Sequence, residues 1–306
     1  MTASAPPIAP ERPGLESLGR IAAFASLSFR ESYRSRSFIV AVVLNLIYFG
    51  LLILIGIAVD SAARAEGQGG LGALLRGEIA VRFLLWFALG GASTLALFVG
   101  VFSSVGAIAT EIERGTILAI VARPVARWEI VLGKLIGYGG LSVFYLVAVS
   151  LLIAGFLYFM TGVWVSDIWP ALALMALNVI VMVALALLGS TRFSTVANAV
   201  IIVVLYLALT NTGILFGIGQ LLNSDLLQSL ADYSRFLLPV GPVSDEAGFI
   251  LLGAGAEFIQ GAPGSGGPSE LLLPRREWLW IYELVYLPVV VALAAISLTL
   301  RDLRGG

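Results

Sequence analysis

The sequence predicts an all-α polytopic membrane protein with six transmembrane helices. Of its 306 residues, 59% are hydrophobic and only 12% are charged, and the mean hydropathy is +1.00. Soluble domains carry about 25% charged residues, so the deficit is too large for a fold in water. Apolar runs long enough to cross about 30 Å of hydrocarbon recur along the chain.

The composition also excludes several classes of function. A net charge of −1 argues against a broad basic surface, so no nucleic-acid partner is expected. The chain has no cysteine and no histidine, which excludes disulfides, thiolate chemistry and imidazole metal ligands. It also lacks a G-x-x-x-x-G-K-[ST] loop for a nucleotide, because Gly133 and Lys134 are followed by Leu135. We therefore expect no catalytic residues and no cofactor or metal on this chain.

Two segments precede the first span. Residues 1–14 are rich in Ala, Pro and Ser and predict a disordered tail. Residues 15–37 predict a basic amphipathic helix that lies in the membrane interface, with a merely solvated helix as the alternative. Its apolar residues recur at helical spacing and arginines lie among its polar positions: Leu18, Ile21, Ala22, Ala25 and Phe29, with Arg20, Arg30 and Arg34.

The remainder, residues 38–306, predicts one six-span domain. The spans are expected at 38–59, 83–109, 130–159, 168–189, 195–219 and 278–300. The first has roughly 22 residues without a charge, which exceeds the apolar core of a signal peptide. We therefore expect it to remain as an uncleaved span.

The basic residues predict the orientation. With the N-terminus inside, twelve of the 18 Lys and Arg residues lie on the cytoplasmic side and six lie outside. This bias matches the positive-inside rule, and an even number of spans places both termini in the cytoplasm. We expect a multi-pass protein of the cell membrane, plasma or inner.

The long connection at 220–277 is predicted to be extracellular. It carries scattered acidic residues, a Gly/Pro-rich stretch at 261–268, and short apolar runs at 236–243 and 249–252. Each run is too short to span. Re-entrant or interfacial helices that form an outer cap are expected, with a floppy loop as the alternative, and an extracytoplasmic partner would bind here.

Few polar side chains lie inside the predicted spans. Lys134 is near the inner edge, where its stem can reach the interface, and Glu283 is similarly near the outer edge. The uncharged polar residues favour hydrogen bonds between helices, and the alternative is that they line a translocation path. The candidates for such a path are Asn45, Ser93, Thr94, Asn178, Asn198 and Asn211.

The most informative stretch is the predicted cytoplasmic segment at 110–129, which continues to a Gly-Lys pair. It leaves the second span as a short helix with charged residues and then has an apolar face. Pro124 biases Arg123 away from helix and ends this face. A short helix held between two spans could transmit motion from a soluble partner, or it could be an ordinary interfacial loop.

This segment resembles the signature of ABC-2 type permeases, the membrane subunits of one class of ATP-binding-cassette exporters. Their pattern is E-x-E-x-G-T-[LI], a helix, R-P-V-S-R and then G-K. The chain departs from it at Ala126, where the family often has Ser. Leu300 to Leu303 and the Arg30-Glu31 pair are also similar to these permeases. The matching positions are Glu111, Glu113, Gly115, Thr116, Ile117, Arg123, Pro124, Val125, Arg127, Gly133 and Lys134.

The resemblance implies a dimer with a second copy or a sibling permease, and a cytoplasmic ATPase that holds ATP and Mg. It implies ATPase coupling through Glu111, Glu113, Arg114, Gly115, Thr116, Arg123, Pro124 and Arg127. Because Glu111 and Glu113 cannot share a helix face, we expect one to meet the ATPase and the other to pair locally, for example Glu111 with Arg114. The alternatives are a non-transporting scaffold that passes ATPase motion to an outer partner, and a membrane enzyme, which the lack of histidine disfavours.

Overall fold

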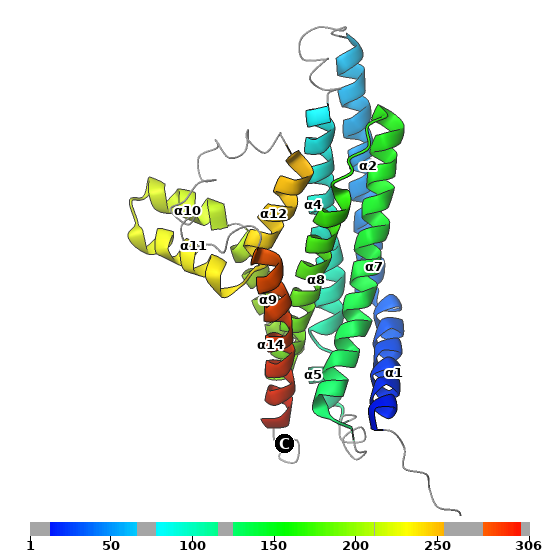
Figure 1. The fold of residues 1–306 in the computed structure, drawn as a ribbon, viewed down its shortest axis with the longest axis vertical. Helices are drawn as coiled ribbons and strands as arrows, with labels where there is room; N and C mark the ends of the chain where they lie inside the picture. The colour runs from blue at the N-terminus through cyan, green and yellow to red at the C-terminus, as the bar shows by residue number, and fades with distance from the viewer. Residues whose placement is uncertain (1–12, 66–77, 116–124, 211, 254–277, 301–306) are drawn as a thin grey trace, which may run out of the picture.

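The computed structural model describes residues 13–65, 78–115, 125–210, 212–253 and 278–300, and every element in these ranges is a helix (Figure 1). The predicted tail at 1–14 lies almost wholly outside them. The helices are α1 (Pro13–Tyr33), α2 (Arg36–Ala65), α4 (Glu78–Ser104), α5 (Ala109–Glu113), α7 (Arg127–Thr161), α8 (Ile168–Ser190), α9 (Thr195–Thr210), α10 (Thr212–Leu221), α11 (Asp225–Leu237), α12 (Val240–Leu252) and α14 (Leu279–Leu300).

Five helices within the described residues are long and apolar enough to cross a membrane: α2, α4, α7, α8 and α14. They match five of the six predicted spans. The remaining prediction, 195–219, is not one helix. Its first part is α9, whose 16 residues reach only about 24 Å, and α10 follows as a separate helix. A sixth span in this region stays a prediction, since the described residues divide it between a short apolar helix and a second helix.

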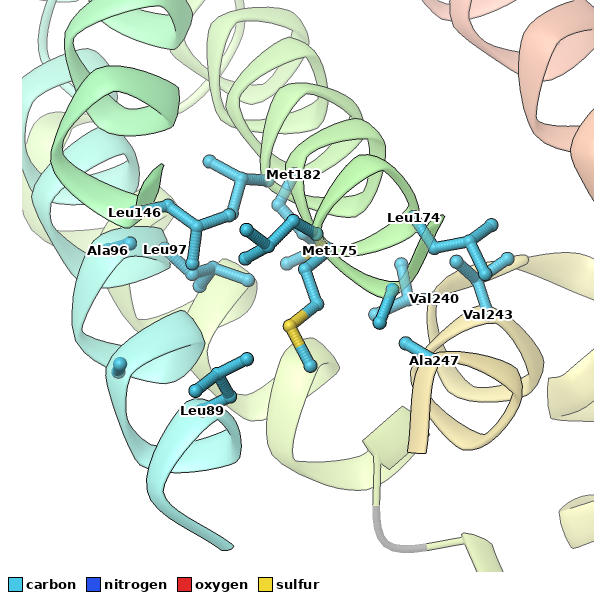
Figure 2. Packing of buried hydrophobic residues seen from close by; sticks show 14 of the residues in the cluster. Leu89, Ala96, Leu97, Leu146, Leu174, Met175, Met182, Val240, Val243 and Ala247 are labelled. Atoms are coloured by element: carbon cyan, nitrogen blue, oxygen red, sulfur yellow. The ribbon is translucent and has the colours of Figure 1, made fainter. Parts of the chain in front are cut away.

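Helix α8 is the centre of the bundle and packs against α4, α7, α9, α12 and α14. Its side chains interlock with those of its neighbours in one apolar core, as Figure 2 shows for Met182 beside Leu146 of α7 and Leu174 beside Val243 of α12. A helix that is apolar on all sides favours this central position.

Small residues bring α4 close to its neighbours. Ala88, Ala92, Ala96 and Gly100 recur every four residues and all are buried, a spacing that lets helices in lipid approach closely. A Cβ atom at Gly100 would lie 2.6 Å from Ser142 Oγ of α7 and 2.6 Å from a methyl group of Val183 in α8. The three helices therefore meet at this glycine.

The described part of the connection expected to form an outer cap contains α11, α12 and the last residues of α10. The apolar runs at 236–243 and 249–252 are not separate, because the second run and the end of the first belong to α12. This helix is buried against α8 and α4, so it is part of the bundle and does not lie over it. Helices α10 and α11 pair with each other and project to the side (Figure 1).

Candidate functional site

One end of the bundle carries α1, α5 and the beginning of α7, and is called the α1 end below (Figure 1). Its centre is Lys134, which is only 3% exposed. The Lys134 ammonium donates to a carboxylate oxygen of Glu111 at 2.8 Å and to the Ala107 carbonyl at 3.1 Å. The Lys134 head group is therefore held inside the protein. It fixes α5 and the turn before it onto α7.

Two glycines of α7 bring α1 into direct backbone contact. A Cβ atom at Gly133 would lie 2.5 Å from Phe24 Cβ, and one at Gly137 would lie 2.5 Å from the Ala25 carbonyl oxygen. Any side chain at these positions would push α1 away. The sequence predicts α1 as an amphipathic helix of the interface, and the structure adds that α7 packs on its small-residue face.

Polar contacts hold α1 in register along α7. Arg20 donates to both carboxylate oxygens of Glu129 at 2.9 Å, and the Tyr138 hydroxyl donates to Glu31 at 2.8 Å. The contacts advance in the same direction on both helices, so α1 runs parallel to α7 over more than two turns. Its location in the membrane interface stays a prediction.

The coupling residues predicted from the sequence divide into two groups. Glu111 pairs locally, as expected of one of the two glutamates, although its partner is Lys134 where Arg114 was suggested. Glu113, Arg114 and Gly115 are exposed at the end of α5, and Gly115 adopts a positive φ of 71° that favours glycine. Thr116, Arg123 and Pro124 lie outside the described residues.

Arg127 begins α7 beside this group. One of its terminal guanidinium nitrogens, Nη1, is buried and has no hydrogen-bond partner within the part of the chain that the structure describes. A buried donor left unpaired is costly, so this guanidinium nitrogen is suited to donate to a further partner.

A cavity of about 380 Å³ lies between α4, α8, α9 and α12, in the half of the bundle away from α1. Three of the predicted path residues line it: Ser93, Thr94 and Asn178. Sequence reasoning did not single out the aromatic side chains of its wall, Trp86, Phe87, Tyr206 and Phe249. No periodic pattern distinguishes them from lipid-facing aromatic residues.

The other predicted path residues lie elsewhere. Asn198 is fully buried and its amide donates at 2.8 Å to the carbonyls of Val105 and Ala186, which ties the start of α9 to the ends of α4 and α8. Asn45 is buried on α2 and does not line the described cavity. Asn211 lies outside the described residues.

Two charged groups lie away from the α1 end, and sequence reasoning did not single out the first of them, Arg82. Arg82 of α4 pairs with Glu78 at 2.9 Å and with Asp167 at 3.1 Å, and also donates to the Leu251 carbonyl at 3.1 Å. It thereby joins α4, the segment before α8 and the end of α12; the i, i+4 spacing of Glu78 and Arg82 was the available signal. Glu283 lies near the start of α14 (Leu279–Leu300), at the edge of its span as expected, and is fully buried there.

These features define a multi-pass helical membrane protein whose charged segment between the second and third spans is fixed onto the third span, an arrangement suited to a transporter. The match to known families is in keeping with this class. Residues 22–303 match the family model of the ABC-2 family transporter proteins, and the chain belongs to that family. This confirms the resemblance to ABC-2 type permeases. No curated protein matches the chain.

Proposed function

We propose that this chain is the permease subunit of an ATP-driven exporter. A separate cytoplasmic ATPase would hold ATP and Mg²⁺, and a second copy of the chain or a sibling permease would complete the membrane part. The α1 end would face the cytoplasm and both termini would lie there, as the distribution of basic residues favours. Family membership supports partnership with an ATPase of this kind.

The observation that carries the proposal is the buried pair of Lys134 and Glu111. Because this pair fixes α5 to α7 at 2.8 Å, and because Gly133 and Gly137 fix α1 to the same stretch of α7, a force on α5 acts on all three helices. Close-packed elements shift between discrete arrangements and do not bend gradually. A push on α5 by the ATPase would therefore move α7 and α1 together.

The exposed end of α5 offers the contact surface for this push. Glu113 and Arg114 present opposite charges there, whereas Glu111 is occupied by Lys134. We therefore assign Glu113 to the ATPase contact and Glu111 to the internal link. Charged groups at the rim of an interface determine specificity and rate of association.

Transport by the complete complex in proteoliposomes tests the proposal. The variants Glu113→Arg and Arg123→Glu should still insert and should retain basal ATP hydrolysis, but ATP should no longer drive net movement of cargo. Asp225→Lys, an exposed charge reversal on α11, is the matched control and should transport normally. Unchanged transport in both coupling variants would refute the coupling role, and uphill transport by the purified chain without an ATPase would refute the proposed function.

A further inference from the structure

The cavity between α4, α8, α9 and α12 has a wall whose hydrogen-bonding protons are largely used up. Ser93 and Thr94 both donate their hydroxyl protons to the Gly90 carbonyl, at 2.8 Å and 3.0 Å. Thr210 donates to the Tyr206 carbonyl at 2.8 Å. These bonds consume the protons of the three hydroxyl groups, so toward any further partner their oxygens act only as acceptors.

The two remaining polar contacts of the wall also use their protons in hydrogen bonds within the protein. The hydroxyls of Thr94 and Tyr206 lie 3.1 Å apart, so the Tyr206 proton is used within the pair. The Asn178 amide donates one proton to the Val240 carbonyl at 3.1 Å and the other to Ser244 Oγ at 2.8 Å. Its carbonyl oxygen Oδ1 is buried and accepts no hydrogen bond within the described residues.

The charges and rings of the wall favour the same type of ligand. Asp245 lines the cavity, and no Lys or Arg is among the described lining residues. Four aromatic side chains, those of Trp86, Phe87, Tyr206 and Phe249, are among the lining residues. Aromatic faces attract organic cations, whereas an anion would find only the Trp86 indole N–H and the Ser244 hydroxyl as side-chain donors.

The size of the cavity suits a small molecule. Ligand pockets measure about 300–1,000 Å³ and combine apolar walls with a few convergent polar groups. We propose that this cavity binds an amphipathic molecule with an apolar or aromatic body and a hydrogen-bond-donating head group, an organic ammonium above all. The idea that this molecule is the exported cargo rests on the proposed function. Its binding to the cavity does not depend on that function.

Binding of three matched probes tests the proposal. The probes share a dansyl group and a short linker and end in an ammonium, a hydroxyl or a carboxylate. They are titrated against the purified full chain in lipid nanodiscs, with empty discs subtracted, and fluorescence anisotropy gives each Kd. The ammonium probe should bind at least about tenfold more tightly than the carboxylate probe, with the hydroxyl probe between them.

Glycine variants identify the site. Gly90 lines the cavity, and a Cβ atom built there meets nothing within 4 Å, so Gly90→Leu places a side chain in open space. This change should raise the Kd of the ammonium probe by about tenfold or more. Gly155→Leu is the control, because Gly155 also sits in a helix, on α7, with nothing within 4 Å of its Cβ position, and it should leave the Kd unchanged.

A second pair of variants tests the acceptor itself. Thr94→Val keeps the shape of the side chain and removes one hydrogen-bond acceptor from the wall. It should raise the Kd of the ammonium probe several-fold more than that of the carboxylate probe. Thr299→Val is the control, because Thr299 likewise donates to a helix carbonyl, that of Ile296 at 2.6 Å, on an exposed face.

Equal binding of the three probes, tighter binding of the carboxylate, or an unchanged Kd in Gly90→Leu would overturn the inference. Because the titration uses no ATPase and no ATP, these outcomes are independent of the proposed function. Loss of coupling in the exporter assay would likewise leave the binding result standing.

Discussion

At the scale of single residues, Lys134 is the clearest case of a charge kept inside the protein. Its ammonium meets one carboxylate and one backbone carbonyl, and its side chain is 4% exposed against 22% for Glu111. Such a pair gains little over an apolar pair, but the loss of one partner leaves the other charge uncompensated. We therefore expect the free energy of unfolding to depend strongly and non-additively on both residues.

Lys134→Met should destabilise the protein by about 3 kcal/mol, measured as the free energy of unfolding in detergent. Glu111→Gln in the Lys134→Met background should recover part of this loss, because it removes the unpaired carboxylate. The interaction energy of the cycle should exceed about 1 kcal/mol. Strictly additive costs would show that the two side chains do not act as a pair.

Asn178 and Asn198 show how one residue type takes two roles. Both are buried amides inside helices, and the sequence predicts the same role for both. The Asn198 amide is committed to carbonyls of α4 and α8, whereas Asn178 lines the cavity. Nothing in the local sequence distinguishes them, since the difference arises from α12, which packs beside Asn178.

Asn198→Leu should therefore lower stability by about 1–3 kcal/mol, because the side chain loses two hydrogen bonds in a fully buried site. The affinity for the ammonium probe should stay the same. Thermal unfolding and the anisotropy titration, carried out on one preparation, measure the two quantities. Weakened probe binding with unchanged stability would place Asn198 at the cavity and contradict this assignment.

At the scale of elements, the contact of α1 with α7 depends on small residues. The sequence contains the signal, because Gly133 and Gly137 are four residues apart. It does not reveal the partner helix, which lies about a hundred residues earlier in the chain: Arg20 and Glu129 are separated by 109 positions.

Gly137→Ala should displace α1, since the new Cβ would lie 2.5 Å from the Ala25 carbonyl oxygen and 2.6 Å from Ser28 Cβ. Overpacking of this kind costs about 1–3 kcal/mol. Gly140→Ala, with nothing within 4 Å of its Cβ position, should stabilise the helix slightly. Limited proteolysis of α1 in the two variants measures the difference, and equal cleavage would contradict the close packing.

The one departure from the family signature also has a structural meaning. Ala126 is the N-cap residue of α7, and its backbone N–H donates to Glu129 at 3.3 Å. The alanine side chain cannot accept a hydrogen bond, so only half of a capping box is present. The serine common in the family would supply the missing half.

Ala126→Ser should thus stabilise the protein by about 0.5–1 kcal/mol. The rise in the free energy of unfolding should vanish in an Ala126→Val variant, which has a similar size and no acceptor. A serine variant no more stable than the valine variant would show that the N-terminus of α7 needs no further cap.

The sequence predicted those helices whose position follows from hydrophobicity alone. It did not predict those whose position depends on tertiary contacts. Five long spans follow from length and apolar content. The division of 195–219 into α9 and α10 does not, since both pieces are apolar. The position of α12 inside the bundle was also missed, because its apolar residues are interrupted by Ser244, Asp245 and Glu246.

At the scale of the whole molecule, charge separates the two ends of the bundle. The α1 end carries Arg20, Arg114, Arg127 and Lys134 among the described residues, and the opposite end holds the Arg82 cluster. The positive-inside rule predicts that the α1 end faces the cytoplasm. Because the chain has no native cysteine, single cysteines can be introduced to measure this orientation without first replacing others.

Glu113→Cys should react with a membrane-impermeant maleimide only after the cells are permeabilised. Ser166→Cys, in the exposed turn between α7 and α8 at the opposite end, should react in intact cells. Mass shift on a gel measures the labelling, and the unmodified chain is the control. The reverse pattern would invert the orientation and refute ATPase contact through α5.

The parallel contact of α1 with α7 also bears on how the protein is made. Ribosomes add roughly 5–20 residues per second, so the 109 positions between Arg20 and Glu129 correspond to a wait of about 5–20 s before α1 can meet its partner. During biogenesis the exposed apolar residues of α1, such as Leu18 and Leu27, would rest against lipid. The nascent α1 would then dock on its partner helix only when the third span arrives.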